Sequence, residues 1–326
     1  MALYLITGGA GFIGSNLVEV LLKQGEEVKV LDNFSTGKEG NLSFIDELKL
    51  PHGKFTLLRE DIRNLSSCHL ACEHVDFVLH QAALGSVPRS VDDPIATNEV
   101  NIQGTLNLLV AARDAKVKRF IYAASSSAYG DPVSAGLKGG EPVPKVESQI
   151  PNPQSPYAIS KLTGEYYCQV FCEIYGLGTI SLRYFNVFGQ RQDANSTYAA
   201  VIPKFIKSLL SGQPPAIYGD GEQSRDFTHI DNVVQANLNA CHSTQDVLGE
   251  TINIACGART TINQLYFKLC EIMNKEIEPL YSSPRAGDVK HSLADIQKAK
   301  NLLDYNPQVN IITGLRKSIE WFVKNA

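Results

Sequence analysis

The chain has 326 residues, of which 44% are hydrophobic and 20% charged, as in an ordinary globular protein. Thirty Lys and Arg against 34 Asp and Glu leave a formal charge of −4, which argues against nucleic acid as the main partner. No apolar run approaches the roughly 18 residues of a membrane span, and the N-terminal residues lack the basic lead of a signal peptide. The seven cysteines are scattered and odd in number, which favours reduced thiols. We therefore expect a cytoplasmic protein that contacts neither nucleic acid nor membrane.

Two of the cysteines raise the question of a metal site. Cys68 and Cys72 share one helical face, and His69 and His74 lie near them in the sequence. No second ligand cluster has zinc-like spacing, so we expect no metal and interpret these thiols as small buried side chains.

Short apolar runs alternate with longer helical patterns along the first two thirds of the chain. The predicted strands are Leu3–Thr7, Val28–Leu31, Phe55–Arg59, Phe77–His80, Phe120–Ala124 and Thr179–Arg183. The predicted helices between them include Gly11–Gln24, Pro94–Ala115 and Tyr157–Tyr175. This alternation predicts an α/β fold with a Rossmann-like, doubly wound parallel sheet covered by helices on both faces.

The last third of the chain changes character. Its predicted helices, separated by loops that contain Pro and Gly, are Ala199–Ser211, Asp231–His242, Thr261–Met273, Ala294–Leu303 and Ile311–Val323. Thr251–Ala255 has the pattern of a further strand. We therefore predict a first domain over residues 1–182, to which residues 226–257 return, and a smaller mixed α/β domain over residues 183–326 that is interleaved with it. The Pro-, Gly- and Ser-rich stretch 131–156 is expected to be a surface loop or lid.

A glycine-rich motif follows the first predicted strand. Gly8, Gly11 and Gly14 are spaced by two residues each and open an amphipathic helix. Glycine in such a turn lets the backbone approach a pyrophosphate at the helix N-terminus. An ordinary glycine-rich turn is the alternative for this motif taken alone.

An acidic residue at the end of the second strand extends the motif. Asp32 lies 18 residues after Gly14, where a carboxylate can accept both ribose hydroxyls of adenosine. It would repel a 2′-phosphate, and position 33 holds no basic residue, so the sequence predicts NAD rather than NADP. Asp61 and Ile62 follow the third strand, where they can contact the adenine. The fourth strand is followed by Gln81, Ala82 and Ala83, and the small side chains in this segment leave room for the backbone to pass the cofactor.

A candidate acid–base group follows in the predicted helix after the loop. Tyr157 and Lys161 form a Tyr-x-x-x-Lys pair whose spacing places both side chains on one helical face. The free phenol has a pKa near 10, and a neighbouring ammonium and the positive nicotinamide ring would favour its ionised form. Ser125 ends a buried strand and can bind the substrate oxygen whose proton Tyr157 removes. Ser126 and Ser127 remain alternatives for that task.

Together these motifs resemble the extended short-chain dehydrogenases/reductases over nearly the whole chain. Residues 182–189, Leu-Arg-Tyr-Phe-Asn-Val-Phe-Gly, and the sequence Arg225-Asp226-Phe227 narrow the resemblance to the UDP-hexose 4-epimerases. The resemblance implies that Asn186 contacts the sugar diphosphate. It also implies that Arg225, with Arg285 and Asp288, holds the nucleotide diphosphate and ribose, which suits the bidentate geometry of arginine.

Three reactions compete within this group of enzymes. Dehydratases usually carry an Asp-Glu pair where this chain has Ser126 and Ser127, and decarboxylases need a pocket for a C6 carboxylate, for which no clear signature is present. The resemblance therefore favours 4-epimerisation through a transient 4-keto sugar. Another UDP-sugar enzyme, such as a UDP-glucuronate epimerase, decarboxylase or 4,6-dehydratase, and a non-catalytic NAD-binding module remain the alternatives.

The substrate is suggested by further small residues. Residues 80–90 and 287–292 resemble the bacterial UDP-N-acetylglucosamine 4-epimerases, in which a small residue at the position of Ser292 leaves room for a 2-acetamido group. Gly85 and Ala200 match small wall residues of that subgroup. We expect interconversion of UDP-GlcNAc and UDP-GalNAc for surface polysaccharide, and activity on UDP-Glc and UDP-Gal stays open. Compared with the enzymes that the chain resembles, residues 133–141 are an insertion, and this insertion leaves the fine substrate specificity undecided.

The sequence predicts a cofactor site and a substrate site. The cofactor site comprises Gly8, Gly11, Phe12, Ile13, Gly14, Asp32, Asn33, Ser35, Thr36, Gly37, Asp61, Ile62, Gln81, Ala82, Ala83, Asn101, Tyr157, Lys161 and Tyr184. The substrate site comprises Gly85, Ser86, Ser125, Ser126, Ser127, Asn186, Ala200, Val201, Tyr218, Arg225, Arg285, Asp288 and Ser292. The resemblance also implies a homodimer joined through the Pro94–Ala115 and Tyr157–Tyr175 helices.

Overall fold

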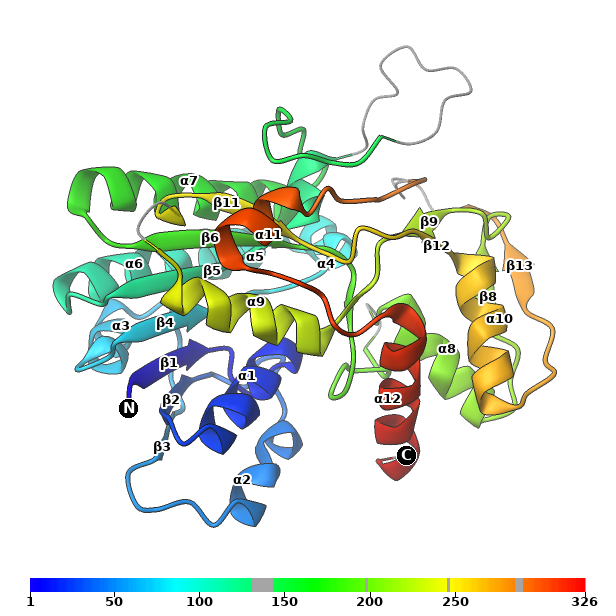
Figure 1. Ribbon diagram of the computed structural model, residues 1–326, viewed down its shortest axis with the longest axis horizontal. Coiled ribbons are helices and arrows are strands. Elements are labelled where there is room, and N and C mark those ends of the chain that lie inside the picture. The colour runs from blue at the N-terminus through cyan, green and yellow to red at the C-terminus, as the bar shows by residue number, and fades with distance from the viewer. Residues whose placement is uncertain (131–142, 197–198, 245–246, 285–289, 326) are drawn as a thin grey trace.

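A parallel sheet of seven strands forms the centre of the molecule (Figure 1). The computed structural model describes residues 1–130, 143–196, 199–244, 247–284 and 290–325. The strands are β1 (Leu3–Thr7), β2 (Glu27–Leu31), β3 (Phe55–Leu58), β4 (Phe77–His80), β5 (Arg119–Ser125), β6 (Thr179–Tyr184) and β11 (Thr251–Ile254). Their order is β11-β6-β5-β4-β1-β2-β3, and every neighbouring pair is parallel. The predicted Rossmann-like fold class is confirmed, and each predicted strand agrees with an observed one to within one residue at either end.

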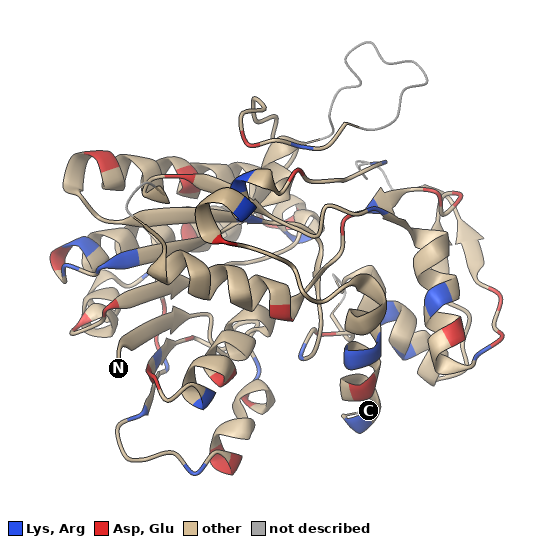
Figure 2. Ribbon diagram, in the orientation of Figure 1, with Lys and Arg blue, Asp and Glu red and all other residues tan. Residues whose placement is uncertain are grey.

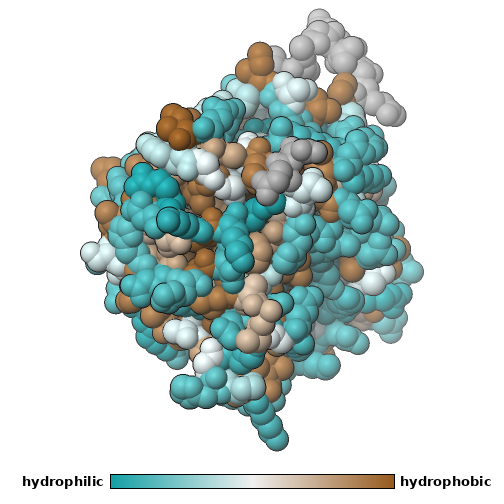
Figure 3. Space-filling model, turned by 60° about the vertical axis from the view of Figure 1, so that its left-hand side comes forward, coloured by the Kyte–Doolittle hydropathy of each residue, from teal (hydrophilic) through white to brown (hydrophobic). Residues whose placement is uncertain are grey.

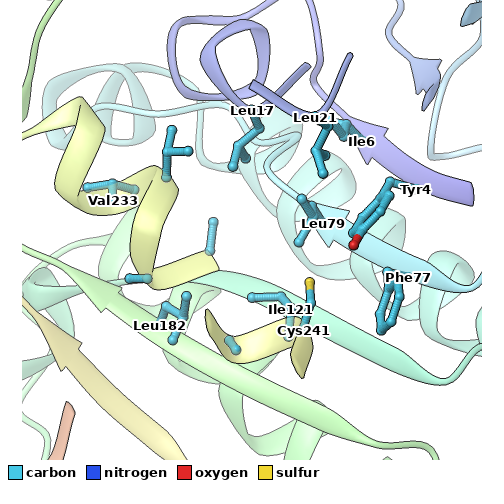
Figure 4. Close-up of a cluster of buried hydrophobic side chains, with 14 of the residues drawn as sticks. Tyr4, Ile6, Leu17, Leu21, Phe77, Leu79, Ile121, Leu182, Val233 and Cys241 are labelled. Carbon is cyan, nitrogen blue, oxygen red and sulfur yellow. The ribbon is translucent and has the colours of Figure 1, made fainter. Parts of the chain in front are cut away.

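Helices cover both faces of this sheet, because the strands carry apolar side chains on each face. On one face lie α1 (Phe12–Lys23), α9 (Ile230–His242) and α11 (Gln297–Leu303). Figure 4 shows Leu17 and Leu21 of α1 and Val233 of α9 meeting the strand side chains of this core. On the other face lie α3 (Leu65–Cys72), α6 (Gly104–Asp114) and α7 (Pro156–Tyr175), which bury a second core. The cysteines Cys68 and Cys72 lie in that second core as free thiols.

The order of the strands reverses between β1 and β4, and this switch point indicates where the site lies. From β1 the chain proceeds to β2 and β3 on one side, and then returns to continue with β4, β5 and β6 on the other. In open α/β sheets, ligands bind at the carboxyl ends of the strands beside such a switch point. The loops after β1, β2, β4 and β5 all carry predicted site residues.

The predicted helix Pro94–Ala115 is divided in the structure. It consists of α5 (Pro94–Asn98), a π-helical segment (Glu99–Gln103) and α6. The short helix α4 (Val87–Asp92) precedes them. The π turn widens the helix by one residue, and no pattern in the sequence marks it. Nearer the N-terminus, a 3₁₀ turn (Glu39–Leu42) and α2 (Phe44–Glu47) connect β2 to β3.

The remaining elements form a C-terminal cluster beside the sheet, at the right of Figure 1. Its helices are α8 (Val201–Leu210), α10 (Ile262–Met273) and α12 (Ile311–Lys324), which share one apolar core. Strand β8 (Ala216–Tyr218) pairs with β13 (Leu280–Ser282), β7 (Val187–Phe188) with β10 (Thr228–His229), and β9 (Ser224–Arg225) with β12 (Thr260–Thr261). The segment predicted as the helix Ala294–Leu303 begins its helix only at Gln297 and packs against β11 as α11.

Charges of both signs are interspersed over the helices and loops (Figure 2). On the face shown in Figure 3, hydrophobic side chains interrupt the hydrophilic surface in small groups. Among the described residues, no helix is long and apolar enough to cross a membrane, and no group of three or more His, Cys, Asp or Glu residues could hold a metal ion.

Helix α7 lies unusually close to the sheet at one residue. A Cβ added to Gly164 would overlap the hydroxyl and ring of Tyr122 in β5, which is fully buried. Glycine at this position therefore lets the helix backbone rest on the tyrosine ring. Nearer the start of α7, Lys161 donates a hydrogen bond to the carbonyl of Ala123 near the carboxyl end of β5.

Gly164→Ala should destabilise the protein by about 1–3 kcal/mol, because the added methyl group overpacks a rigid, buried contact. Urea unfolding followed by circular dichroism measures the change. Gly40→Ala is the matched control, since a Cβ at Gly40 meets nothing within 4 Å, and it should change the free energy of unfolding by less than about 0.5 kcal/mol. Equal effects of the two substitutions would contradict the close approach of α7.

Candidate active site

The glycine-rich turn between β1 and α1 forms one wall of the site. Gly8 has φ +67°, and a Cβ on it would lie 2.8 Å from the backbone of Ala82, so only glycine fits between the two loops. A Cβ on Gly14 would overlap the carbonyl oxygen of Gly8. Gly11 caps α1 without a side-chain hydrogen bond, and the first turn contains no acidic residue. The N–H groups in the first turn of α1 receive no side-chain cap and can therefore bind an anion such as a pyrophosphate.

Asp32 lies at the end of β2, next to that turn. Its two carboxylate oxygens accept hydrogen bonds of 2.8 Å from the backbone N–H groups of Ala10 and Phe34. Burial raises its pKa from the ordinary value, and these hydrogen bonds lower it in part. Each oxygen keeps a second lone pair, which suits the two ribose hydroxyls expected there.

Asn33 and Asp61 join the ends of β2 and β3. The Asn33 amide donates to Asp61 over 2.7 Å, and Arg63 pairs with the same carboxylate at 2.8 Å. The hydrogen bond from Arg63 lowers the pKa of Asp61 to about 2. The guanidinium of Arg63 is thus engaged by a carboxylate at the edge of the site.

One cavity brings nearly all the predicted cofactor residues together. It is lined by Gly8, Gly11, Phe12, Ile13, Gly14, Asp32, Asn33, Ser35, Thr36, Gly37, Asp61, Ile62, Gln81, Ala82, Ala83, Tyr157, Lys161 and Tyr184. Gly85, expected at the substrate, lines it as well. The sequence reasoning missed Leu31, Glu60, Leu84, Val100, Ala123 and Ala124. Leu31, Glu60, Ala123 and Ala124 lie within two residues of a strand end, so the strand boundaries are the signal that could have identified them, whereas Leu84 lies in the loop after β4 and Val100 in the π segment.

Asn101 is the predicted cofactor residue that does not line this cavity. It is buried in the π segment, where its amide accepts from Leu84 N–H at 2.8 Å and donates to Leu84 C=O at 3.1 Å. It also donates to the Ser160 hydroxyl at 3.0 Å, and Ser160 donates to the carbonyl of Tyr157. Asn101 therefore connects the cavity loop at Leu84 to the first turn of α7.

Tyr157 and Ser125 meet where β5 ends and α7 begins. Ser155 caps α7 through the Ala158 N–H, which places Tyr157 in the first turn. Burial raises the pKa of Tyr157, and a hydrogen bond with Ser125 lowers it in part. The prediction of an ionised phenol concerns the site with the nicotinamide ring bound; in the chain by itself, burial outweighs the hydrogen bond with Ser125. The Ser125 oxygen also accepts from the Ser127 hydroxyl at 2.9 Å, whereas no hydrogen bond of Ser126 is described.

Lys161 lies one turn further along α7, with 4% of its surface exposed. Its ammonium donates to the carbonyl oxygen of Ala123 at 2.8 Å and lies 5.0 Å from the ring centroid of Tyr122. Burial lowers its pKa to about 8. Burial, together with the charge of Lys161, lowers the pKa of the neighbouring His80 to about 3, so the His80 ring is neutral.

His80 connects the glycine-rich turn to the helix of Asn101. Its ring nitrogens lie 2.7 Å from the hydroxyl oxygen of Thr7 and 2.9 Å from that of Thr105. Thr105 donates to the carbonyl of Asn101 at 2.6 Å. This buried chain of hydrogen bonds fixes the β1 and β4 ends relative to the π segment.

Tyr184 closes the far end of the cavity. Its hydroxyl receives hydrogen bonds from Asn237 at 2.8 Å and from Gln81 at 3.2 Å. Burial raises its pKa to about 12. Asn237 is a fully buried polar residue on the apolar face of α9. A polar residue within the apolar pattern of α9 is the signal in the sequence that could have identified Asn237 as a site residue.

A second cavity, of about 570 Å³, lies between β7 and the C-terminal cluster. Five predicted substrate residues line it, namely Asn186, Ala200, Val201, Tyr218 and Arg225. Lys204, Lys207 and Gln223 also line it and were not predicted. An elongated polar ligand could therefore continue from Tyr184, beside the first cavity, past Asn186 into this basic chamber.

Asp226 is a structural centre next to the second cavity. It is fully buried, and its carboxylate accepts from the backbone N–H groups of Cys256 and Gly257 at 3.0 Å and of Ala294 at 3.3 Å. Its own carbonyl accepts from the side chain of Asn186 at 3.1 Å. The carboxylate thus ties the segments after β11 and before α11 to the strand that carries Arg225.

The remaining predicted substrate residues lie around these cavities. Ser86 has φ +104° and caps α4, and Ser126 and Ser127 begin a 3₁₀ turn (Ser126–Tyr129) after β5. Ser292 is buried, and its N–H donates to the carbonyl of Ser224 at 3.0 Å, beside Arg225. Arg285 and Asp288 lie outside the described residues.

Residues 4–255 match the NAD dependent epimerase/dehydratase family. The chain belongs to this family. It is also an extended short-chain dehydrogenase/reductase of the UDP-hexose 4-epimerase group, as the resemblance implies, and its cofactor is NAD. The uncapped N-terminus of α1, the space beside Gly8 and the carboxylate of Asp32 fit that dinucleotide.

Relatives agree with this assignment along the whole chain. The putative UDP-glucose 4-epimerase of Methanocaldococcus jannaschii is 35% identical over 98% of both chains. The solved UDP-N-acetylglucosamine 4-epimerase of Methanobrevibacter ruminantium M1, in complex with UDP-N-acetylmuramic acid, is 39% identical, with a TM-score of 0.89 over 100% of this chain and 99% of that one. A UDP-glucuronic acid 4-epimerase of Bacillus cereus, solved with NAD and a fluorinated UDP-glucuronic acid, is 33% identical, with a TM-score of 0.88 over 99% and 100%.

Asp226→Asn should change how stability depends on pH. Burial raises the pKa of Asp226 to about 6, whereas an unfolded aspartate titrates near 3.9. The folded state therefore holds the proton more tightly, and this contribution to the free energy of unfolding is complete below about pH 4 and lost as the pH rises through 6. The loss amounts to about 3 kcal/mol.

Urea unfolding of the wild type and of Asp226→Asn between pH 4 and 7 measures this effect. The amide cannot ionise, so the stability difference between the two proteins should narrow as the pH rises. A difference that stays constant over this range would contradict the burial of the carboxyl group.

Proposed function

We propose that the protein is a 4-epimerase that interconverts UDP-GlcNAc and UDP-GalNAc. Tyr157 is the acid–base group at the sugar 4-hydroxyl, Ser125 binds the same oxygen, and Lys161 supplies positive charge that favours the phenolate. The observation that carries the proposal is the contact between Tyr157 and Ser125 at the end of the NAD cavity, next to a separate basic cavity.

The residues divide the work between them. Bound NAD would accept the C4 hydrogen of the sugar with its electron pair and return it, which no side chain can do. Tyr157 removes the hydroxyl proton and later returns it. Asn186 and Arg225, with Arg285 and Asp288, bind the UDP diphosphate and ribose, so that the sugar can turn about its link to the diphosphate while UDP stays bound. The pKa of Tyr157 then depends on the positive charges that face it when the site is occupied.

Epimerisation suits these side chains better than the rival reactions. Elimination of water across C5 and C6 needs a carboxyl acid–base pair, and the turn after Ser125 offers only the hydroxyls of Ser126 and Ser127. An acetylated substrate is favoured by the small residues Gly85, Ala200 and Ser292, and by the similarity to the Methanobrevibacter enzyme. The similarity to UDP-glucuronic acid 4-epimerases makes UDP-glucuronate the first rival substrate.

The organisation of the chain follows from this proposal. Residues 1–182 with 226–257 hold NAD, and the rest of 183–326 holds the UDP-sugar. We assign a homodimer to the outer faces of α5 and α7, where Ile95, Tyr166 and Ile174 are exposed by 72%, 53% and 68%. The free cysteines support a cytoplasmic enzyme, and surface polysaccharide is the proposed destination of its products.

Incubation of the purified protein with UDP-GlcNAc, UDP-Glc and UDP-glucuronate, each followed by NMR of the anomeric protons, tests the proposal. We expect UDP-GalNAc from UDP-GlcNAc at unchanged mass. Tyr157→Phe should lower kcat by about 10² to 10⁴ because the ring stays and the proton carrier is lost. It should leave NAD bound. Conversion of UDP-glucuronate alone, or full turnover by Tyr157→Phe, would overturn the assignment.

Ser292→Tyr tests the substrate preference. The backbone of Ser292 is held beside β9, next to Arg225, which lines the second cavity, and we propose that a phenol ring at this position reduces the space for the acetamido group. We expect kcat/KM for UDP-GlcNAc to fall by about tenfold or more, while that for UDP-Glc changes little. Ser292→Ala serves as the control for loss of the hydroxyl. Equal losses on both sugars in Ser292→Tyr would show that this position does not select the acetamido group.

A further inference from the structure

Three charged side chains are buried where α7 packs on β6. Lys161 and Glu165 lie one turn apart on the helix, and Arg183 of β6 pairs with Glu165. Each is only 4% exposed. Arg183 donates from Nε to one oxygen of Glu165 at 2.9 Å and from Nη2 to the other at 2.7 Å. Lys161 alone of the three lines the NAD cavity.

Stability does not by itself account for such a pair. Removing two ions from water costs several kcal/mol each, and well-packed apolar residues are often as stable as a buried ion pair. The guanidinium of Arg183 also lies 4.5 Å from the ring centroid of Tyr129, and one of its nitrogens has no hydrogen-bond partner among the described residues. The arrangement holds charge close to the acid–base group at a cost in desolvation.

The surroundings of Lys161 indicate where that charge acts. Its own hydrogen bond goes to a neutral carbonyl, that of Ala123. The described groups around it are Tyr157 and Glu165, one turn before and after it on α7, Cys168 further along α7, Tyr122 on β5, neutral His80 on β4, and the guanidinium of Arg183 on β6, which pairs with Glu165. From the side of α5 and the π segment, Asn101 reaches α7 through the neutral hydroxyl of Ser160. Within this described set, Glu165 is the carboxylate.

We propose that Glu165 is a positioning residue that keeps Lys161 in its ammonium form, and that Arg183 keeps Glu165 ionised and in place for that task. The inference deepens the proposed function, since it concerns the charge that favours the phenolate of Tyr157. Glu165 does not line either cavity described above, so it acts through Lys161 rather than on the substrate.

The shifts in ionisation agree with this arrangement. Burial lowers the pKa of Lys161 to about 8, and Glu165 opposes that change. Arg183 and Lys161 in turn oppose the rise that burial causes in the pKa of Glu165. Without the carboxylate, the effect of burial on Lys161 loses its largest opposing contribution, and the ammonium is lost at a lower pH.

NMR of protein labelled with [ε-¹³C]lysine measures this titration directly, with the Lys161 signal assigned from Lys161→Met. In Glu165→Gln the titration midpoint of Lys161 should fall by about one pH unit or more. The alkaline limb of kcat for UDP-GlcNAc should move with it. At pH 8.5 the variant should be about eightfold slower than the wild type, while at pH 6.5 the two should agree within about twofold, with KM unchanged.

Two further variants separate charge from structure. Glu173→Gln makes the same change on the exposed part of α7 and should leave both the titration and kcat unchanged. The double variant E165Q/R183Q removes the buried charges together but keeps side chains that can hydrogen-bond. It should fold where Glu165→Gln alone is unstable, and Lys161 should still titrate at lower pH than in the wild type.

A wild-type midpoint for Lys161 in a folded Glu165→Gln or double variant would overturn the inference and leave the pair a structural one. Absence of UDP-sugar turnover by the wild type would instead remove the proposed function. The NMR titration needs no substrate, so it still decides the role of Glu165 in that case.

Discussion

The close packing of α7 on β5 is the contact on which the rest of the site depends. Gly164 lets the helix rest on the ring of Tyr122, and Lys161, one turn earlier, reaches the carbonyl of Ala123 over 2.8 Å. Tyr157, a further turn back, meets Ser125 where β5 ends. A helix held further from the sheet would separate the phenol from the strand-end hydroxyl. Packing and chemistry are therefore set by the same few residues.

Burial is the second constraint, and it raises the cost of every charge near the site. It raises the pKa of Tyr157 and Asp226 and lowers that of Lys161 and His80. The fold meets these costs with hydrogen bonds from backbone groups, as at Asp32 and Asp226, and with the paired side chains of Glu165 and Arg183.

The sequence was informative where the chemistry is local. The glycine-rich turn, Asp32 and the Tyr157–Lys161 pair each follow from spacing within one turn or one strand end, and nearly all of the predicted cofactor residues line one cavity. Contacts between distant segments were not predictable in this way. Asn237 reaches Tyr184 from 53 residues away, and Asp226 binds N–H groups from two later segments.

Two features of the site depend on more than the spacing of residues. Asn101 was expected at the cofactor, but the π turn directs its amide to Leu84 and Ser160 instead. The predicted fall in the pKa of Tyr157 depends on the nicotinamide ring as well as on Lys161, and in the chain by itself the desolvation of the phenol outweighs its hydrogen bond to Ser125. Sequence spacing can place a lysine near a tyrosine, but it does not give the cost of burying both.

The central claim is that Tyr157 and Ser125 act at C4 of a UDP-sugar while its hydrogen passes to the dinucleotide and back. Conversion of UDP-GlcNAc in D₂O, with the product examined by NMR and mass spectrometry, tests it most directly. The account predicts UDP-GalNAc with no carbon-bound deuterium at C4, since the hydrogen that leaves this carbon is the one that returns. A deuterium at C4 of the product would contradict it, because that hydrogen would then have exchanged with water.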